Sequence, residues 1–257
     1  MDFKKAIVAG AFALASSTSF ATYIAPGSAL GTGLNNATQG GNFTGTYDLA
    51  NDQYTPDEVW TIDAVSSANT VMMFEFAGFA STSTMGVYDL NNIANKLELF
   101  SGAATTGWST KLQVIGANLV ATYFDAAGLV QGQTVSAFGS GDSFGFYLST
   151  QQNNTFYSQS ALNSDANHLG ETDHMLAYRG DNTLQMDPDG DGNYGLFTNN
   201  NFVLAWEDLV LNNSDLDYSD MVVMVESFVP VPEPTTIALL GLGLAGLGMA
   251  RRKQAKA

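Results

Sequence analysis

The chain has 257 residues, with 25 acidic and 9 basic side chains and a net charge of -16 at neutral pH. This charge argues against nucleic acid as a partner, because phosphate backbones are bound by clustered lysine and arginine. Cysteine is absent, which excludes disulfides, thiolate metal sites and thiol catalysis, so a core or a bound metal must supply the stability.

The amino terminus has the pattern of a secretory signal peptide over residues 1–21. Lys4 and Lys5 precede an apolar stretch over residues 6–15, and Ser19-Phe20-Ala21 is a small-x-small cleavage site. We expect cleavage after Ala21. The alternative is an uncleaved anchor, against which the shortness of the apolar stretch argues.

Residues 22–228 have the pattern of an all-β, antiparallel, jelly-roll-like sandwich. Residues 22–46 are rich in Gly, Asn and Thr and predict a loose leader or an edge strand. Short apolar runs bounded by Gly, Asn, Ser and Asp then predict strands, over residues 70–76, 85–89, 96–100, 111–115, 119–124, 143–148, 174–178, 201–206 and 221–225. Residues 90–98 and 206–213 fit either a helical turn or a strand, and 149–170 fits a long loop with or without a short helix.

The segment 187–193 has the spacing of a calcium loop. Asp187, Asp189 and Asp191 occupy alternate positions, Gly192 the sharp turn, and Asn193 offers its backbone carbonyl. Thr198 stands where an EF-hand needs a bidentate glutamate, so a further ligand must come from elsewhere in the fold or from water. The alternative is that these residues only form a hairpin turn.

Further acidic residues follow within the next thirty positions and are candidates for that ligand. Packing carboxylates together without a cation costs free energy through repulsion and raised pKa values. The candidates are Glu207, Asp208, Asp215, Asp217 and Asp220. The alternative role of the last three is to cap backbone amides.

Catalytic motifs are weak in this chain. His168 and His174 are the only histidines, and no Gly-x-Ser-x-Gly elbow accompanies them. A pair of carboxylates for glycoside hydrolysis remains open. Trp60, Trp108 and Trp206 are candidates for stacking on sugars, although tryptophan in a sandwich more often packs in the core. We therefore expect no enzymatic activity, with a secreted hydrolase acting on polysaccharide or peptide as the alternative.

The carboxyl terminus, residues 229–257, has three parts. Pro232-Glu233-Pro234 precedes an apolar run over residues 235–250, and Arg251 and Arg252 follow it. The run predicts a transmembrane helix of roughly 24 Å, which is short for a bilayer core of about 30 Å. The basic residues should stay cytoplasmic, which places the preceding chain outside.

This tail resembles a PEP-CTERM sorting signal. The resemblance implies a Gram-negative bacterium that makes extracellular polysaccharide, and an exosortase that recognises Pro232, Glu233 and Pro234 with the trailing Arg251 and Arg252. It also implies an inner-membrane intermediate and then the cell surface or the extracellular matrix. A plain membrane anchor is the alternative.

Residues 174–226 carry a second resemblance. The segments 174–178, 202–209 and 214–223 are similar to a domain-of-unknown-function family (number four-one-one-four), whose members often precede such tails. The resemblance implies no reaction. Together these patterns predict an exported, calcium-stabilised protein with a structural or binding role in a polysaccharide or biofilm layer, with extracellular polysaccharide as a further partner.

Overall fold

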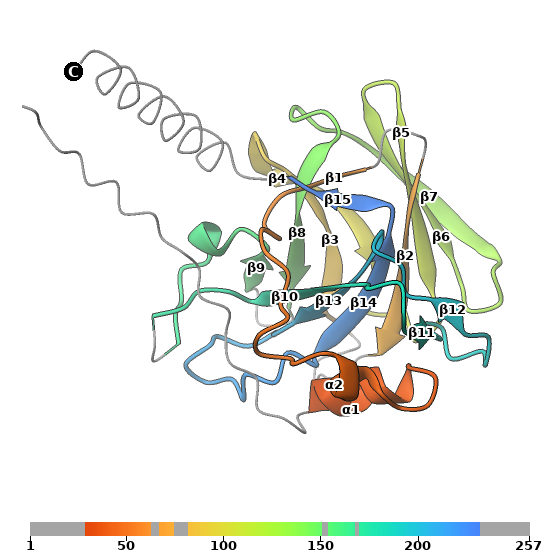
Figure 1. Cartoon of the computed structure of the whole chain (residues 1–257). Coiled ribbons are helices and arrows are strands. Elements are labelled where there is room, and N and C mark those ends of the chain that lie inside the picture. Colours follow the sequence, from red (N-terminus) through yellow and green to blue (C-terminus); the bar gives the residue numbers. More distant parts are fainter. Residues whose placement is uncertain (1–28, 63–66, 75–81, 151–153, 168–169, 232–257) are drawn as a thin grey trace, which may run out of the picture.

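Two antiparallel β-sheets face each other and form a sandwich (Figure 1). The computed structural model describes residues 29–62, 67–74, 82–150, 154–167 and 170–231. One sheet has six strands in the order β15-β1-β8-β3-β4, with β9 paired to β8, and the other has seven in the order β10-β13-β14-β2-β5-β6-β7. A separate hairpin joins β11 and β12.

The helices are α1 (Ala29–Asn36), α2 (Phe43–Thr46) and a 3-10 turn (Ser160–Leu162). The strands are β1 (Trp60–Ile62), β2 (Ala68–Phe74), β3 (Thr84–Asp89), β4 (Asn92–Phe100), β5 (Ser109–Ile115), β6 (Asn118–Phe124), β7 (Val130–Ala137), β8 (Ser143–Ser149), β9 (Thr155–Tyr157), β10 (Met175–Arg179), β11 (Gln185–Met186), β12 (Gly195–Leu196), β13 (Asn201–Trp206), β14 (Met221–Glu226) and β15 (Phe228–Pro230).

The main core lies between the two sheets and is rich in aromatic side chains. Trp60 packs edge-on against Phe202 with ring centroids 5.0 Å apart, and against Phe146 at 5.6 Å. Each fully buried large apolar side chain stabilises the fold by about 1.5–3 kcal/mol. The chain has no cysteine, so this aromatic core supplies stability that disulfides supply in many exported domains.

A second core covers the outer face of the seven-stranded sheet. Leu30 and Leu34 lie one helical turn apart on α1 and are fully buried in a cluster with residues of β10 and β13. Phe43 of α2 stacks on Tyr47 at 4.7 Å in the same cluster. All six residues of β13 are therefore buried, because the strand is covered on both faces.

The prediction of a loose leader or edge strand for residues 22–46 is wrong over its described part, residues 29–46. Gly31 and Gly33 lower helix propensity by roughly 1 kcal/mol each, which is why the sequence pattern did not indicate a helix. Both glycines are buried in α1. Packing against the sheet thus outweighs local propensity here (Figure 1).

The nine predicted strands are all present, and the all-β antiparallel prediction is confirmed. Residues 92–100 form the strand alternative of the segment 90–98, whereas 207–213 are bends and turns. The segment 149–170 holds β9 and the 3-10 turn. No pattern in the sequence indicated the other six strands of the described chain, which are β1, β7, β9, β11, β12 and β15.

A substitution at Gly86 should destabilise the sandwich strongly. An added Cβ would lie 2.2 Å from the Leu97 carbonyl oxygen and 2.9 Å from the Glu98 Cα, both backbone atoms of β4. We expect Gly86→Ala to lower the free energy of unfolding by about 3 kcal/mol, measured by urea denaturation. Gly132→Ala on β7 is the matched control, because its nearest contact is 3.9 Å away. Equal midpoints for the two variants would contradict this account.

Several sequence predictions lie outside the described residues. They include the signal peptide with its cleavage site at Ala21, the transmembrane helix 235–250, and the sorting residues Pro232, Glu233, Pro234, Arg251 and Arg252. Within the ranges that the structure describes, none of the helices has the length and apolar character needed to cross a bilayer.

Candidate metal centre

The loop that joins β13 to β14 carries five of the predicted metal ligands. Glu207 and Asp208 follow directly after Trp206 at the end of β13, and Asp220 stands directly before β14. The Asp220 N–H donates to the Trp206 carbonyl at 3.2 Å, and the Asp208 N–H donates to the Asp220 carboxylate at 2.9 Å. The two strand ends therefore hold these three acids side by side.

Tyr218 anchors the middle of this loop. Its ring is fully buried in the second core, and its hydroxyl donates to the Asp173 carbonyl at 2.8 Å. Leu216 and Tyr218 have φ values of 56° and 54°, a left-handed conformation that costs non-glycine residues free energy and needs compensation from packing. The left-handed residues alternate with Asp215 and Asp217 along the loop. One carboxylate oxygen of each of these two aspartates lies within 4.8 Å of a Glu207 oxygen.

The acidic side chains form two overlapping groups that share Glu207. One group is Glu207, Asp208 and Asp220, and the other is Glu207, Asp215 and Asp217. In each group, one carboxylate oxygen from every residue lies within 4.8 Å of those of the other two. Glu207 is 0% exposed and Asp208 3%. Glu207 Oε2 and Asp208 Oδ2 are buried and have no hydrogen-bond partner among the described residues.

Unpartnered buried carboxylate oxygens are costly, and they are also the ligands that hard divalent cations prefer. Burial raises the pKa of Glu207 to about 9, and the neighbouring Asp220 adds to the shift. Burial likewise raises the pKa of Asp208 to about 7, again with Asp220 adding. The pKa of Asp220 is also raised, mainly by burial. Without a cation, Glu207 keeps its proton at neutral pH. A bound cation would favour the deprotonated carboxylates instead.

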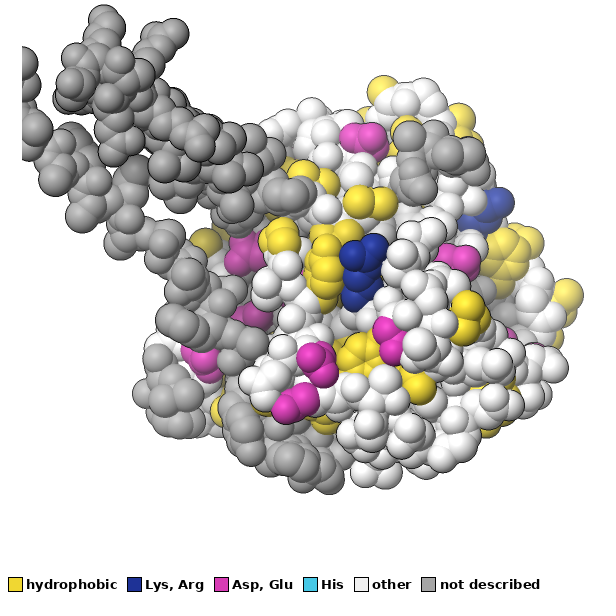
Figure 2. All heavy atoms as spheres, viewed as in Figure 1, with side chains coloured by type: hydrophobic (Ala, Val, Ile, Leu, Met, Phe, Trp, Pro, Cys, Tyr) yellow, Lys and Arg dark blue, Asp and Glu magenta, His cyan; other side chains and the backbone are white. Residues whose placement is uncertain are grey.

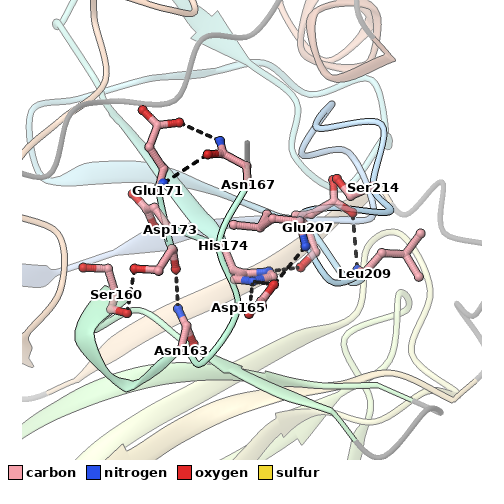
Figure 3. A network of polar contacts seen from close by, with 12 residues as sticks. Ser160, Asn163, Asp165, Asn167, Glu171, Asp173, His174, Glu207, Leu209 and Ser214 are labelled. Carbon is pink, nitrogen blue, oxygen red and sulfur yellow. Dashed lines mark hydrogen bonds and ion pairs between the residues drawn. The ribbon is translucent and has the colours of Figure 1, made fainter. Parts of the chain in front are cut away.

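His174 lies between Asp165 and the backbone of Glu207 (Figure 3). Its Nδ1 lies 3.2 Å from the Glu207 carbonyl oxygen, and its Nε2 lies 3.1 Å from both oxygens of the Asp165 carboxylate. Asp165 also accepts a hydrogen bond from the Leu211 N–H at 2.8 Å. Burial lowers the pKa of His174, while the adjacent Asp165 acts in the opposite direction. Through these contacts the ring ties the 207–211 backbone to the segment before β10.

Both ring nitrogens of His174 are thus engaged, and its ring stacks on Phe156 at 3.7 Å with 0% exposure. These contacts give the residue a structural role, in which it joins the segment before β10 to the 207–211 backbone. His168, the other histidine, lies outside the described residues.

The calcium-like loop 187–193 lies in the β11–β12 hairpin, apart from the acids of the 207–220 loop. Asp187, Asp189 and Asp191 offer oxygens within 4.8 Å of one another. The Asp187 carboxylate accepts hydrogen bonds from the N–H groups of Asp191 at 3.1 Å and Gly192 at 2.9 Å. Hydrogen bonds from Asn193 lower the pKa of Asp191. The loop's own amides therefore satisfy much of its charge, as in a hairpin turn.

Sequence reasoning missed Asp165, Asp173 and Asp57. Asp165 lies in a segment expected only to be a loop, and no spacing pattern connects it with His174. Burial raises the pKa of Asp173 to about 7 and that of Asp57 well above its usual range, with mutual proximity adding to the second shift. For Asp173, the only local feature in the sequence is its position next to His174, directly before an apolar strand.

Figure 2 shows acidic side chains spread over one face of the molecule and basic side chains at few places. Lys96, Lys111 and Arg179 are the basic residues of the stretch 22–228. Lys96 lies over the rings of Tyr147 and Tyr157, and Arg179 lies over those of Tyr54 and Phe202. Two of these three cationic side chains are therefore engaged with aromatic rings.

Two families match parts of the chain. The family described as Domain of unknown function (DUF4114) matches residues 138–227, and the PEP-CTERM protein-sorting motif matches residues 230–253. No curated protein matches the chain. Both resemblances stated from the sequence are confirmed. The DUF4114 match begins earlier than the predicted residue 174, at residue 138, so it also includes β8 and the turn before it.

The chain is thus an exported protein with a DUF4114 segment followed by a PEP-CTERM tail, which exosortase processes at the membrane. The acidic centre, from Glu207 to Asp220, lies wholly inside the DUF4114 segment.

Proposed function

We propose that this protein is a non-enzymatic component of the cell surface or extracellular matrix, with a structural or binding role in a polysaccharide or biofilm layer. Its 207–220 loop binds a divalent cation, calcium being the best fit, and the cation locks the ends of β13 and β14. The proposal rests on one observation, the buried and unpartnered oxygens of Glu207 and Asp208.

Calcium suits this donor set because it takes six to eight oxygen ligands in flexible geometry, whereas magnesium demands a near-ideal octahedron. Glu207, Asp208 and Asp220 are the inner donors, while Asp215 and Asp217 reach Glu207 from the outer side of the loop. The described part of the chain offers no nearby lysine or arginine as a substitute, since its three basic side chains lie over aromatic rings or on β5.

The hydrolase alternative has less support. The cavity next to Trp108 and Tyr123 is lined by one acidic side chain, Glu98, whereas glycoside hydrolysis uses two carboxyl groups flanking the bond. His174 has no ring nitrogen left for a nucleophile. A binding role needs neither a second carboxyl group nor a histidine with a free ring nitrogen.

Calorimetric titration of the full-length protein with calcium tests the centre. Glu207→Gln keeps the side chain's shape and removes its charge, and we expect it to weaken calcium binding at least tenfold, because Glu207 belongs to both acid groups. Asp189→Ala is the matched variant for the 187–193 loop and should leave this binding event in place.

The reverse outcome, loss of binding in Asp189→Ala alone, would place the cation in the β11–β12 hairpin. Absence of calcium binding by the unsubstituted protein would overturn the proposed cation centre altogether.

A further inference from the structure

A cavity of about 180 Å³ opens at the edge of the sandwich, where β4 meets β5, β6 and β7. Buried Leu99, Phe100 and Ala104 contribute its apolar floor. The half-buried rings of Trp108 and Tyr123 line it and pack against the main core. The cavity lies outside the segment 138–227 that the DUF4114 family matches.

Trp108 is the tryptophan that a ligand can reach. Trp60 and Trp206 are 0% exposed, so they pack in the core, which was the favoured expectation for tryptophan in a sandwich. The Trp108 side chain is half-buried, and its indole N–H has no hydrogen-bond partner among the described residues. Its backbone is fixed, because the Met72 N–H donates to the Trp108 carbonyl at 2.9 Å.

The cavity lining also holds polar side chains. No described residue hydrogen-bonds to the half-buried Glu98 carboxylate, and burial raises its pKa. The Tyr123 hydroxyl donates to the Glu98 backbone carbonyl at 2.9 Å, which links the two sheets and fixes the ring. The Ser109 hydroxyl, also in the lining, has no hydrogen-bond partner in the described part of the chain.

We infer that this cavity binds one neutral pyranose ring of a polysaccharide chain. The inference rests on the proposed function, because it names the ligand class that a matrix protein would hold. A pyranose ring has an apolar C–H face that packs on an aromatic plane, and hydroxyls at its edge. Trp108 and Tyr123 supply the planes, Glu98 accepts adjacent hydroxyls, and Ser109 with the indole N–H completes the polar contacts.

Charge selects the kind of sugar. Glu98 lies in the cavity, and the whole chain carries a net charge of -16. A uronic acid would bring a carboxylate next to this carboxylate, and like charges in a partly desolvated site repel. A neutral hexose avoids that repulsion and donates its hydroxyl protons to Glu98.

Fluorescence quenching by iodide tests the inference on the full-length protein, purified in a detergent without a sugar headgroup. Trp108 is the half-exposed tryptophan, while Trp60 and Trp206 are fully buried, so iodide should quench Trp108 selectively. We expect cello- or manno-oligosaccharides to protect it in a saturable manner, and oligogalacturonate of the same length to bind at least tenfold more weakly.

Trp108→Ala and Glu98→Gln should each weaken binding of the neutral oligosaccharide at least tenfold in calorimetric titration. Tyr194→Ala is the control, because this exposed aromatic residue lies on the β11–β12 hairpin, and it should bind as the unsubstituted protein does. Unchanged binding in Trp108→Ala, equal binding of oligogalacturonate, or no binding of either neutral oligosaccharide would overturn the inference.

These outcomes are separable from those of the cation centre. Glu207→Gln should retain oligosaccharide binding when the protein is folded, and Trp108→Ala should retain calcium binding. Loss of sugar binding with calcium binding intact therefore refutes this inference alone.

Discussion

Calcium should raise the melting temperature of the protein by about 5–10 °C at saturation, since a ligand at a hundred times its dissociation constant adds about 2.7 kcal/mol of stability. The increase should be larger near pH 8 than near pH 5, because calcium binds the deprotonated carboxylates. Thermal melting followed by circular dichroism, with calcium or with a chelator, measures both effects.

The pH dependence in the chelator has a defined sign. Folding raises the pKa of Glu207 to about 9 and those of Asp208 and Asp173 to about 7, whereas the unfolded chain titrates these groups near 4. The folded protein therefore keeps protons that the unfolded chain has lost. Stability is highest below about pH 4 for these groups and falls as the pH rises through 7 and then toward 9.

Two isosteric variants separate the contributions. Glu207→Gln should remove the calcium effect and part of the decline in stability with pH. Asp173→Asn lies outside both acid groups, so it should flatten the decline while leaving the calcium effect intact. A melting temperature in chelator that rises from pH 5 to pH 8 would contradict the burial of these acids.

Replacing Pro232, Glu233 and Pro234 by alanine should prevent processing of the chain in its native cell. The sorting motif matched at residues 230–253 includes these three positions, and we expect the exosortase that the motif implies to recognise them. We expect mass spectrometry to find the unsubstituted protein starting at Thr22 and ending near the Pro-Glu-Pro segment. The substituted chain should retain Arg251 and Arg252.

The matched control is Glu207→Gln, which alters the acidic centre and leaves the tail unchanged. Its two termini should equal those of the unsubstituted protein. Identical carboxyl termini in the alanine variant and the unsubstituted protein would show that Pro-Glu-Pro is not the recognition element.

The strands of the sandwich could be predicted where a buried face left a period of two in the sequence. β5 is such a case, with Thr110 and Leu112 buried and Ser109, Lys111 and Gln113 only partly so. β7 could not, because it is an edge strand with no buried residue. The helix α1 was missed because its stability comes from Leu30 and Leu34 packing on the sheet, which no local pattern records.

The acidic composition of the site was visible in the sequence, but its geometry was not. The spacing of Asp187, Asp189 and Asp191 made that loop the sharper candidate, yet its backbone amides already bind the carboxylates. Glu207 and Asp208 were predicted only as sources of an additional ligand for that loop. Their burial depends on Tyr218 and on the layer around His174, which join the site from distant positions.

β15 ends just before the Pro-Glu-Pro segment, so almost no linker separates the sandwich from the sorting motif. Phe228–Pro230 pairs with β1, and the Val231 N–H donates to the Val59 carbonyl at 2.8 Å, one position before Pro232. Because this connection is so short, an enzyme that reaches Pro-Glu-Pro must either approach close to the β15 edge of its sheet or separate β15 from β1 first. A few Gly-Ser residues inserted after Val231 would lengthen this connection. Faster carboxyl-terminal processing of that variant would show that steric crowding limits the processing rate.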